Sequence, residues 1–82
     1  MVTPENIKQW IEAGLTNSQV DVAGDGHHFE AVIVCAEFAD KTMVEQHQMV
    51  YQALGDKMKA EIHALSMRTF TPEQWTQQQG NT

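Results

Sequence analysis

The amino-acid sequence predicts an α+β domain with the element order α-β-β-α-β-α, in which a three-stranded mixed sheet carries helices on one face. Three observations lead to this prediction. Threonine-led helix starts recur along the chain, and two of them continue into proline and glutamate. A long apolar, β-prone run lies in the first half of the chain, and a turn rich in glycine stands just before it.

The first half of the chain is expected to hold one helix and a β-hairpin. Thr3-Pro4-Glu5 combines an N-cap residue, a proline at the first helical position and an acid in the first turn. A short strand at Val20–Val22 leads through the turn Gly24-Asp25-Gly26 into Phe29–Ala36, the best candidate for a central strand. The pair His27-His28 therefore lies at the hairpin tip or at the start of this strand.

The second predicted helix begins with a capping box formed by Thr42 and Glu45. The helix ends at Gly55 or continues through Lys59. The residues expected on its buried stripe recur at helical spacing, and they are Met43, His47, Val50 and Leu54.

The last part of the chain is expected to form a strand and a short helix. The strand covers Ile62–Phe70, with His63 at its beginning. A second capping box, Thr71-Pro72-Glu73-Gln74, opens a helix around Trp75. Residues 76–82 are polar and are expected to form a frayed tail. The whole chain, 1–82, is interpreted as one domain.

Composition excludes several classes of protein. With 82 residues the chain has a small core and no room for a deep active site. Its formal net charge of −6 disfavours unspecific binding to phosphate backbones. No apolar run approaches the roughly 20 residues of a membrane span, and the first residues do not resemble a signal peptide. A single cysteine excludes an internal disulfide, so we expect a reduced, cytoplasmic protein that does not bind membranes.

No pattern of residues predicts an enzyme. The sequence has no nucleophile elbow, no phosphate-binding loop and no zinc-type pair of ligands at regular spacing. Cys35 lies inside the apolar strand, where a cysteine is interpreted as a small buried hydrophobe. We therefore expect no enzymatic activity.

The four histidines are the most informative polar residues. His47 falls on the apolar helix stripe, which predicts a structural role. His27 and His28 are adjacent, so in a strand they point to opposite faces and do not readily chelate one ion together. From spacing alone, His63 is equally compatible with edge packing and with metal binding. Imidazoles from the hairpin tip and from the third strand would supply half a coordination shell at most.

A nucleic-acid surface is the alternative hypothesis. Apart from histidines, the cations in the second half of the chain are Lys57, Lys59 and Arg68. A contiguous basic face made from these three would favour binding of DNA, whereas scattered cations would leave this function without an electrostatic basis.

Three segments together resemble the BolA family. They are Val44-x-x-His47-x-x-Val50-Tyr51, Ile62-His63-Ala64-Leu65-Ser66 and Thr71-Pro72-Glu73-Gln74-Trp75, and Phe38 before the second helix fits as well. The resemblance runs from about Ile7 to Trp75, and the short hairpin turn is most similar to the IbaG (YrbA) branch, known for acid stress.

The resemblance implies a fold like the class II KH domain and a partner, a monothiol glutaredoxin with a Cys-Gly-Phe-Ser motif. In such a complex a [2Fe–2S] cluster is shared by the glutaredoxin cysteine, by glutathione and by the BolA-like protein, which holds no cofactor when it is alone. The family's C-terminal histidine corresponds to His63. A second ligand comes from the loop between the first two strands, where this chain offers His27 and His28. The implied function is iron–sulfur trafficking and stress response.

Two departures from the family bear on the alternative, a DNA-binding transcriptional regulator. Many members flank the helix histidine with arginines, whereas this chain has Gln46-His47-Gln48. The Gly-x-x-Gly loop with which KH domains bind RNA is absent from the sequence. Both differences disfavour binding of nucleic acid. The connector also has Asp40 where the family often has glycine.

Overall fold

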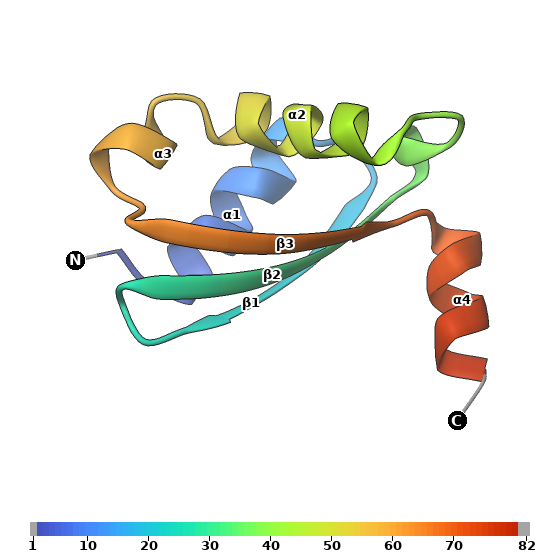
Figure 1. Cartoon of the computed structure of the whole chain (residues 1–82), viewed down its shortest axis with the longest axis horizontal. Helices are drawn as coiled ribbons and strands as arrows, with labels where there is room; N and C mark the ends of the chain where they lie inside the picture. Colours follow the sequence, from blue (N-terminus) through green and yellow to red (C-terminus); the bar gives the residue numbers. More distant parts are fainter. Residues whose placement is uncertain (1, 81–82) are drawn as a thin grey trace.

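The computed structural model describes residues 2–80 and has the predicted order of elements, with two additional short turns (Figure 1). The strands are β1 (Ser18–Gly24), β2 (His28–Cys35) and β3 (Ala64–Phe70). The helices are α1 (Pro4–Gly14), α2 (Met43–Leu54), α3 (Lys57–Ala60) and α4 (Pro72–Gly80), and a single 3-10 turn, η1, covers Ala36–Phe38.

The three strands form the predicted mixed sheet in the order β1-β2-β3. β1 and β2 are an antiparallel hairpin, and β2 pairs with β3 in parallel. The central strand buries one face completely, because Phe29, Ala31 and Ile33 are each at most 2% exposed. The parallel pair needs a crossover, which α2 and α3 supply.

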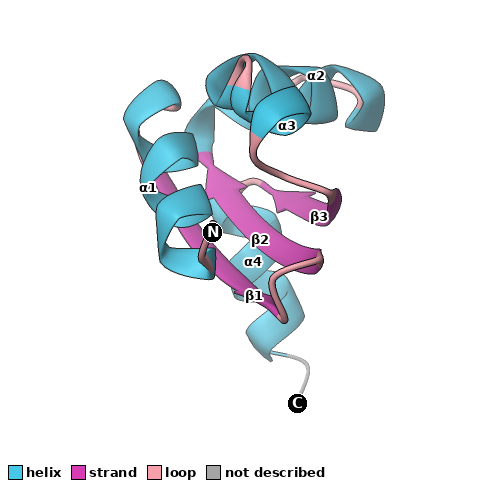
Figure 2. Ribbon diagram, turned by 90° about the vertical axis from the view of Figure 1, so that its left-hand side faces the viewer, coloured by secondary structure: helices cyan, strands magenta, loops and turns pink. Residues whose placement is uncertain are grey.

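The helices α1, α2 and α3 cover one face of the sheet, as predicted (Figures 1 and 2). The core between these layers consists mainly of aliphatic side chains with Phe29 and Phe38, both at most 1% exposed. α4 lies beyond the end of β3 and packs against β2 and β3 there. The Trp75 ring lies 5.2 Å from the Phe70 ring between centroids, and this contact attaches α4 to the sheet.

Capping boxes begin α1, α2 and α4. In α2 the Thr42 hydroxyl accepts the Glu45 N–H at 3.1 Å, and the Glu45 carboxylate accepts the Thr42 N–H at 2.8 Å. The hydrogen bond from the Thr42 backbone holds the pKa of Glu45 below its usual value. Thr71 and Gln74 form the same pair of bonds at the start of α4.

The last helix is longer than the sequence predicts. α4 continues to Gly80, so residues 76–80 are helical where a frayed tail was expected. Glutamine is a good helix former, and the capping box fixes the helix start, so the polar run can continue the helix. Residues 81 and 82, also assigned to the tail, lie outside the described residues.

The buried stripe of α2 is rotated relative to the prediction. Met43 is 69% exposed and His47 is half-buried, whereas the buried residues are Gln46, Val50 and Leu54. The prediction for Met43 was therefore wrong. A polar residue occupies the inward position because its amide is fully hydrogen-bonded: Gln46 Nε2 donates to the carbonyls of Phe38 (3.2 Å) and Lys41 (3.1 Å). Its Oε1 accepts the Thr69 hydroxyl at 2.6 Å.

α2 ends at Gly55, the first of the two predicted alternatives, and α3 is a separate turn of helix. Asp40 lies in the connector with φ 64°, a left-handed conformation that glycine adopts freely and aspartate tolerates. The structure thus gives a physical reason for glycine at this connector position.

We expect Gln46→Ala to lower the free energy of unfolding by about 2 kcal/mol, because it removes three hydrogen bonds from a buried position. Urea unfolding followed by circular dichroism measures the change. Gln48→Ala is the matched control, since it makes the same substitution at an exposed position of the same helix. Equal unfolding midpoints for the two variants would contradict the role assigned to Gln46.

Candidate functional site

The hairpin tip between β1 and β2 is a tight turn built around Asp25. One carboxylate oxygen of Asp25, Oδ1, accepts the backbone N–H groups of His27 and His28, both at 2.9 Å. These two bonds lower the pKa of Asp25, with the bond from His28 the larger cause. Gly26 has φ 101°, and a Cβ on Gly24 would lie 2.4 Å from the His28 carbonyl oxygen, so the turn requires both glycines.

The parallel register places this tip beside the start of β3. His28 is opposite Ala64, and the Ala64 N–H donates to the His27 carbonyl at 3.1 Å. β3 begins at Ala64, two residues later than the predicted start at Ile62, so His63 lies in the bend immediately before the strand and not within it. The residues preceding β2 and β3 are therefore neighbours in space.

The structure brings two of the three predicted metal ligands together. The rings of His27 and His63 meet edge to face, with centroids 6.0 Å apart and planes at 85°. Both residues are exposed. His28 is the first residue of β2, also exposed, and its ring has no such contact with another ring among the described residues. Of the two hairpin histidines, His27 is therefore the one whose ring contacts His63.

His27 and His63 place two exposed imidazoles side by side at this end of the sheet. Imidazole nitrogens are accepted ligands of iron in clusters in place of thiolates. Within residues 2–80, no group of three or more His, Cys, Asp or Glu side chains is arranged to hold a metal ion. Further ligands would have to come from another molecule, and the exposure of both rings permits this.

The remaining histidine and the cysteine lie elsewhere. His47 is half-buried on α2, where it lines a shallow pocket with Met67 and Phe70. Its position in the pocket agrees with a structural role. The polar side chain of this helix that is buried and hydrogen-bonded, however, is Gln46. Cys35 is fully buried, and its Sγ donates to the Thr16 carbonyl at 3.5 Å, which confirms its interpretation as a core residue.

The three candidate DNA-binding cations lie on two elements, Lys57 and Lys59 on α3 and Arg68 on β3. The Lys57 ammonium lies 5.0 Å from the centre of the Trp10 ring, so its side chain is turned toward α1. The Arg68 guanidinium lies 5.4 Å from the centre of the Phe70 ring, near the end of β3 where α4 begins. α3, which also carries Lys59, lies at the opposite end of the sheet (Figure 1).

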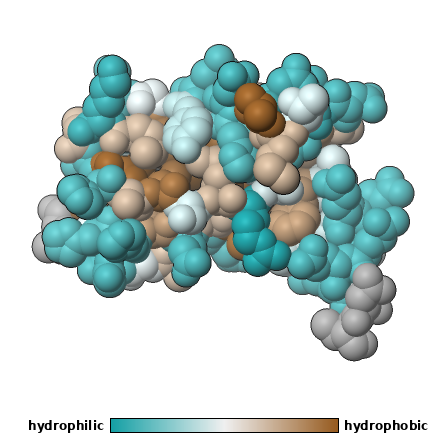
Figure 3. Space-filling model, viewed as in Figure 1, coloured by the Kyte–Doolittle hydropathy of each residue, from teal (hydrophilic) through white to brown (hydrophobic). Residues whose placement is uncertain are grey.

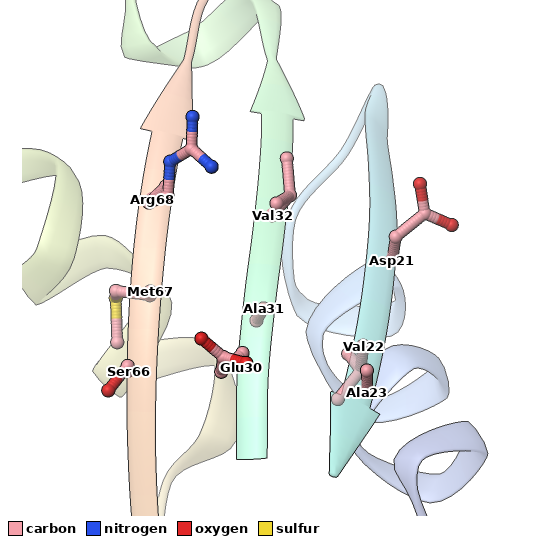
Figure 4. Close-up of a pocket in the computed structure, with 9 residues that line it drawn as sticks. All are labelled: Asp21, Val22, Ala23, Glu30, Ala31, Val32, Ser66, Met67 and Arg68. Carbon is pink, nitrogen blue, oxygen red and sulfur yellow. The ribbon is translucent and has the colours of Figure 1, made fainter.

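Two surface features were missed by the sequence analysis. The uncovered face of the sheet forms a hollow of about 320 Å³, bordered by Asp21, Glu30 and Arg68 with Val32 between them (Figure 4). Apolar side chains are also exposed on α2, at Met43 and Val44, and Figure 3 shows apolar surface between α2 and β3. Strand alternation could have indicated the first feature. The exposed apolar residues of α2 could be predicted only by knowing which side of the helix faces the core.

The sequence model of the BolA-like protein family matches residues 11–74. The chain belongs to the BolA-like family. A solved BolA homologue from Coxiella burnetii is similar to it with 52% identity and a TM-score of 0.88, covering 93% of this chain and 99% of that one. The yeast protein Fra2 has 28% identity and a TM-score of 0.74, over 92% and 85% of the two chains.

Relatives of this BolA-like chain have different names. The DNA-binding transcriptional regulator BolA of Haemophilus influenzae is 44% identical over 55 residues, which cover 67% of this chain and 53% of that protein. BOLA2 of Arabidopsis thaliana is 40% identical over 77 residues, covering 83% and 82%. The chain therefore spans about half of the Haemophilus regulator and most of BOLA2. Within residues 2–80, none of the helices is long and apolar enough to cross a bilayer.

We expect the contact between the two imidazoles to be visible in solution. Because the His27 ring meets the His63 ring edge to face, His63→Ala should shift the ring protons of His27, and it should leave those of His47 unchanged. Both residues are exposed, so His63→Ala should change stability by no more than about 0.5 kcal/mol. Proton–carbon NMR spectra of the histidine rings make the comparison. Unshifted His27 signals would contradict the contact.

Proposed function

We propose that this BolA-like protein is a non-enzymatic adaptor that binds a monothiol glutaredoxin and shares a [2Fe–2S] cluster with it. The observation that carries this proposal is the pair of exposed imidazoles, His27 and His63, with ring centroids 6.0 Å apart. His63 and His27 would hold one iron, while the thiolates of the glutaredoxin and of glutathione would hold the other ligand positions.

The placement of the pair supports an adaptor. Each ring is exposed at one end of the sheet, where a partner can approach both without opening the core. The backbone beneath the rings is fixed by the bond from the Ala64 N–H to the His27 carbonyl. Metal ligands on a rigid, exposed support favour binding between two proteins, because little conformational entropy is lost when the partner arrives.

One relative contains a BolA domain as a part of a larger protein. One solved neighbour is described as the BolA domain of SufE1 from Arabidopsis thaliana, at 28% identity and a TM-score of 0.73. That description places a BolA domain inside a named larger protein. We also propose that this chain is IbaG-like, which its short hairpin supports, with a cytoplasmic role in iron–sulfur trafficking and in the response to acid stress.

We expect His63→Ala and His27→Ala each to alter or destabilise the mixed cluster, because each removes one imidazole of the pair. The test reconstitutes the cluster with a Cys-Gly-Phe-Ser glutaredoxin and glutathione and records visible absorption and circular dichroism. His28→Ala and His47→Ala are matched controls, since each removes a histidine outside the pair. Spectra of the His63 variant identical to those of the wild type would overturn the proposal.

Binding of DNA is the second candidate function. Relatives named DNA-binding transcriptional regulator BolA favour it, including the Haemophilus protein. The charge of the chain disfavours it, since the net charge is −6 and Lys57 and Arg68 lie over rings on different elements. Few cations are thus available on one face to replace the counterions of a duplex.

We expect DNA affinity to be weak and to depend steeply on salt. Fluorescence anisotropy with a labelled duplex at physiological ionic strength measures it, and Arg68→Gln tests the cation nearest to the open sheet face. A sequence-specific dissociation constant tighter than about 10⁻⁸ M, in the range of established regulators, would make DNA binding the leading function.

A further inference from the structure

The Asp25 side chain has a place at the hairpin tip that the pairing of the strands alone does not explain. A hairpin turn is closed by backbone bonds, and here the Asp25 N–H donates to the His28 carbonyl at 3.2 Å. The Asp25 carboxylate adds two further bonds within the same turn, to the N–H groups of His27 and His28 at 2.9 Å each. The turn is therefore held from the inside by a side chain as well as by the backbone.

These bonds fix His27 on both of its sides. Its N–H donates to Asp25, and its carbonyl accepts the Ala64 N–H at 3.1 Å. Ala64 directly follows His63, so the backbone that carries one imidazole is bonded to the residue next to the other imidazole. With both peptide groups of His27 restrained, its side chain leaves the turn toward His63.

The bond from the His28 N–H to Asp25 decides that His27, and not His28, remains in the turn. Because the His28 N–H is bonded to Asp25, β2 begins at His28, and the strand register pairs this residue with Ala64. Successive side chains of a strand alternate between its faces, so His28 follows Glu30 on the uncovered face. His27 is excluded from this alternation and stays beside His63.

We propose that Asp25 is a positioning residue, whose carboxylate holds the His27 backbone so that the His27 ring remains beside His63 for metal binding. This inference rests on the proposed function, because it assigns the pair to a metal. In this proposal Asp25 is not a metal ligand, because its carboxylate accepts the N–H groups of His27 and His28. Residues that orient a ligand in this way commonly change metal affinity by about 10–100-fold when they are replaced.

Three variants separate the possible roles of Asp25. Asp25→Ala removes both hydrogen bonds and the charge. Asp25→Asn removes the charge but keeps a carbonyl oxygen that can accept the same two N–H groups. Asp21→Ala is the matched control, because it removes an exposed carboxylate from the hairpin strand β1 without disturbing the turn.

The first measurement uses the protein without metal. In NMR spectra we expect Asp25→Ala to abolish the ring-to-ring contact between His27 and His63 and to speed hydrogen exchange of the His27 amide at least about 10-fold. Asp25→Asn and Asp21→Ala should behave like the wild type. If Asp25→Ala does not fold, the decision falls on Asp25→Asn: loss of the ring contact in this folded variant would overturn the hydrogen-bond account.

The second measurement uses the cluster reconstituted with glutaredoxin and glutathione. Visible circular dichroism follows the loss of the cluster to a chelator, and we expect Asp25→Ala to lose it about 10-fold faster than the wild type or the two other variants. Wild-type cluster stability in Asp25→Ala would overturn the positioning role even if the His63 variant is impaired. A wild-type protein that forms no mixed cluster would overturn the proposed function instead, and the metal-free spectra would then decide whether Asp25 orients the ring.

Discussion

The parallel pairing of β2 with β3 is the constraint on which the candidate site depends. In a parallel pair both strands begin at the same end of the sheet, so the residues that precede them become neighbours. His27 precedes β2 and His63 precedes β3, and the bond between the Ala64 N–H and the His27 carbonyl continues the ladder to this point. An antiparallel β3 would instead place His63 near Cys35, at the far end of the central strand.

The crossover helix α2 makes this parallel pairing possible. The sequence failed to predict which side of α2 faces the core. The capping box at Thr42 is a local signal that gave the correct start of α2, and the end at Gly55 is one of the two predicted alternatives. The rotation of a helix depends on what its side chains meet. Gln46 is inward because three partners on η1, on the connector and on β3 satisfy its amide, and one of them, Thr69, is 23 residues away in the sequence. A prediction that follows the apolar residues alone therefore places Met43 and His47 in the core instead of Gln46.

The site itself could be predicted in part. The turn Gly24-Asp25-Gly26 and the apolar run after it indicate a hairpin, and the resemblance to the BolA family points to His63 and to the hairpin histidines. The sequence could not decide between His27 and His28, because adjacent residues differ only by where the strand begins. That boundary is set by the Asp25 carboxylate and by the register with Ala64, a residue on another strand. The length of α4 was likewise missed, because its polar face gives no periodic signal.

The position of the histidine pair follows from the size of the domain. A chain of 82 residues uses its apolar side chains to fill one core between the sheet and α1 and α2, and polar groups inside that core must be fully bonded, as Gln46 is. A complete metal site would need several more polar ligands held together, which the described residues do not offer. Two imidazoles at the rim of the sheet require no burial and no further ligand from this chain. In the proposed complex, neutral imidazoles would bring no charge to the metal, so the thiolates of the second protein would dominate the binding energy, and this domain would contribute orientation and selectivity.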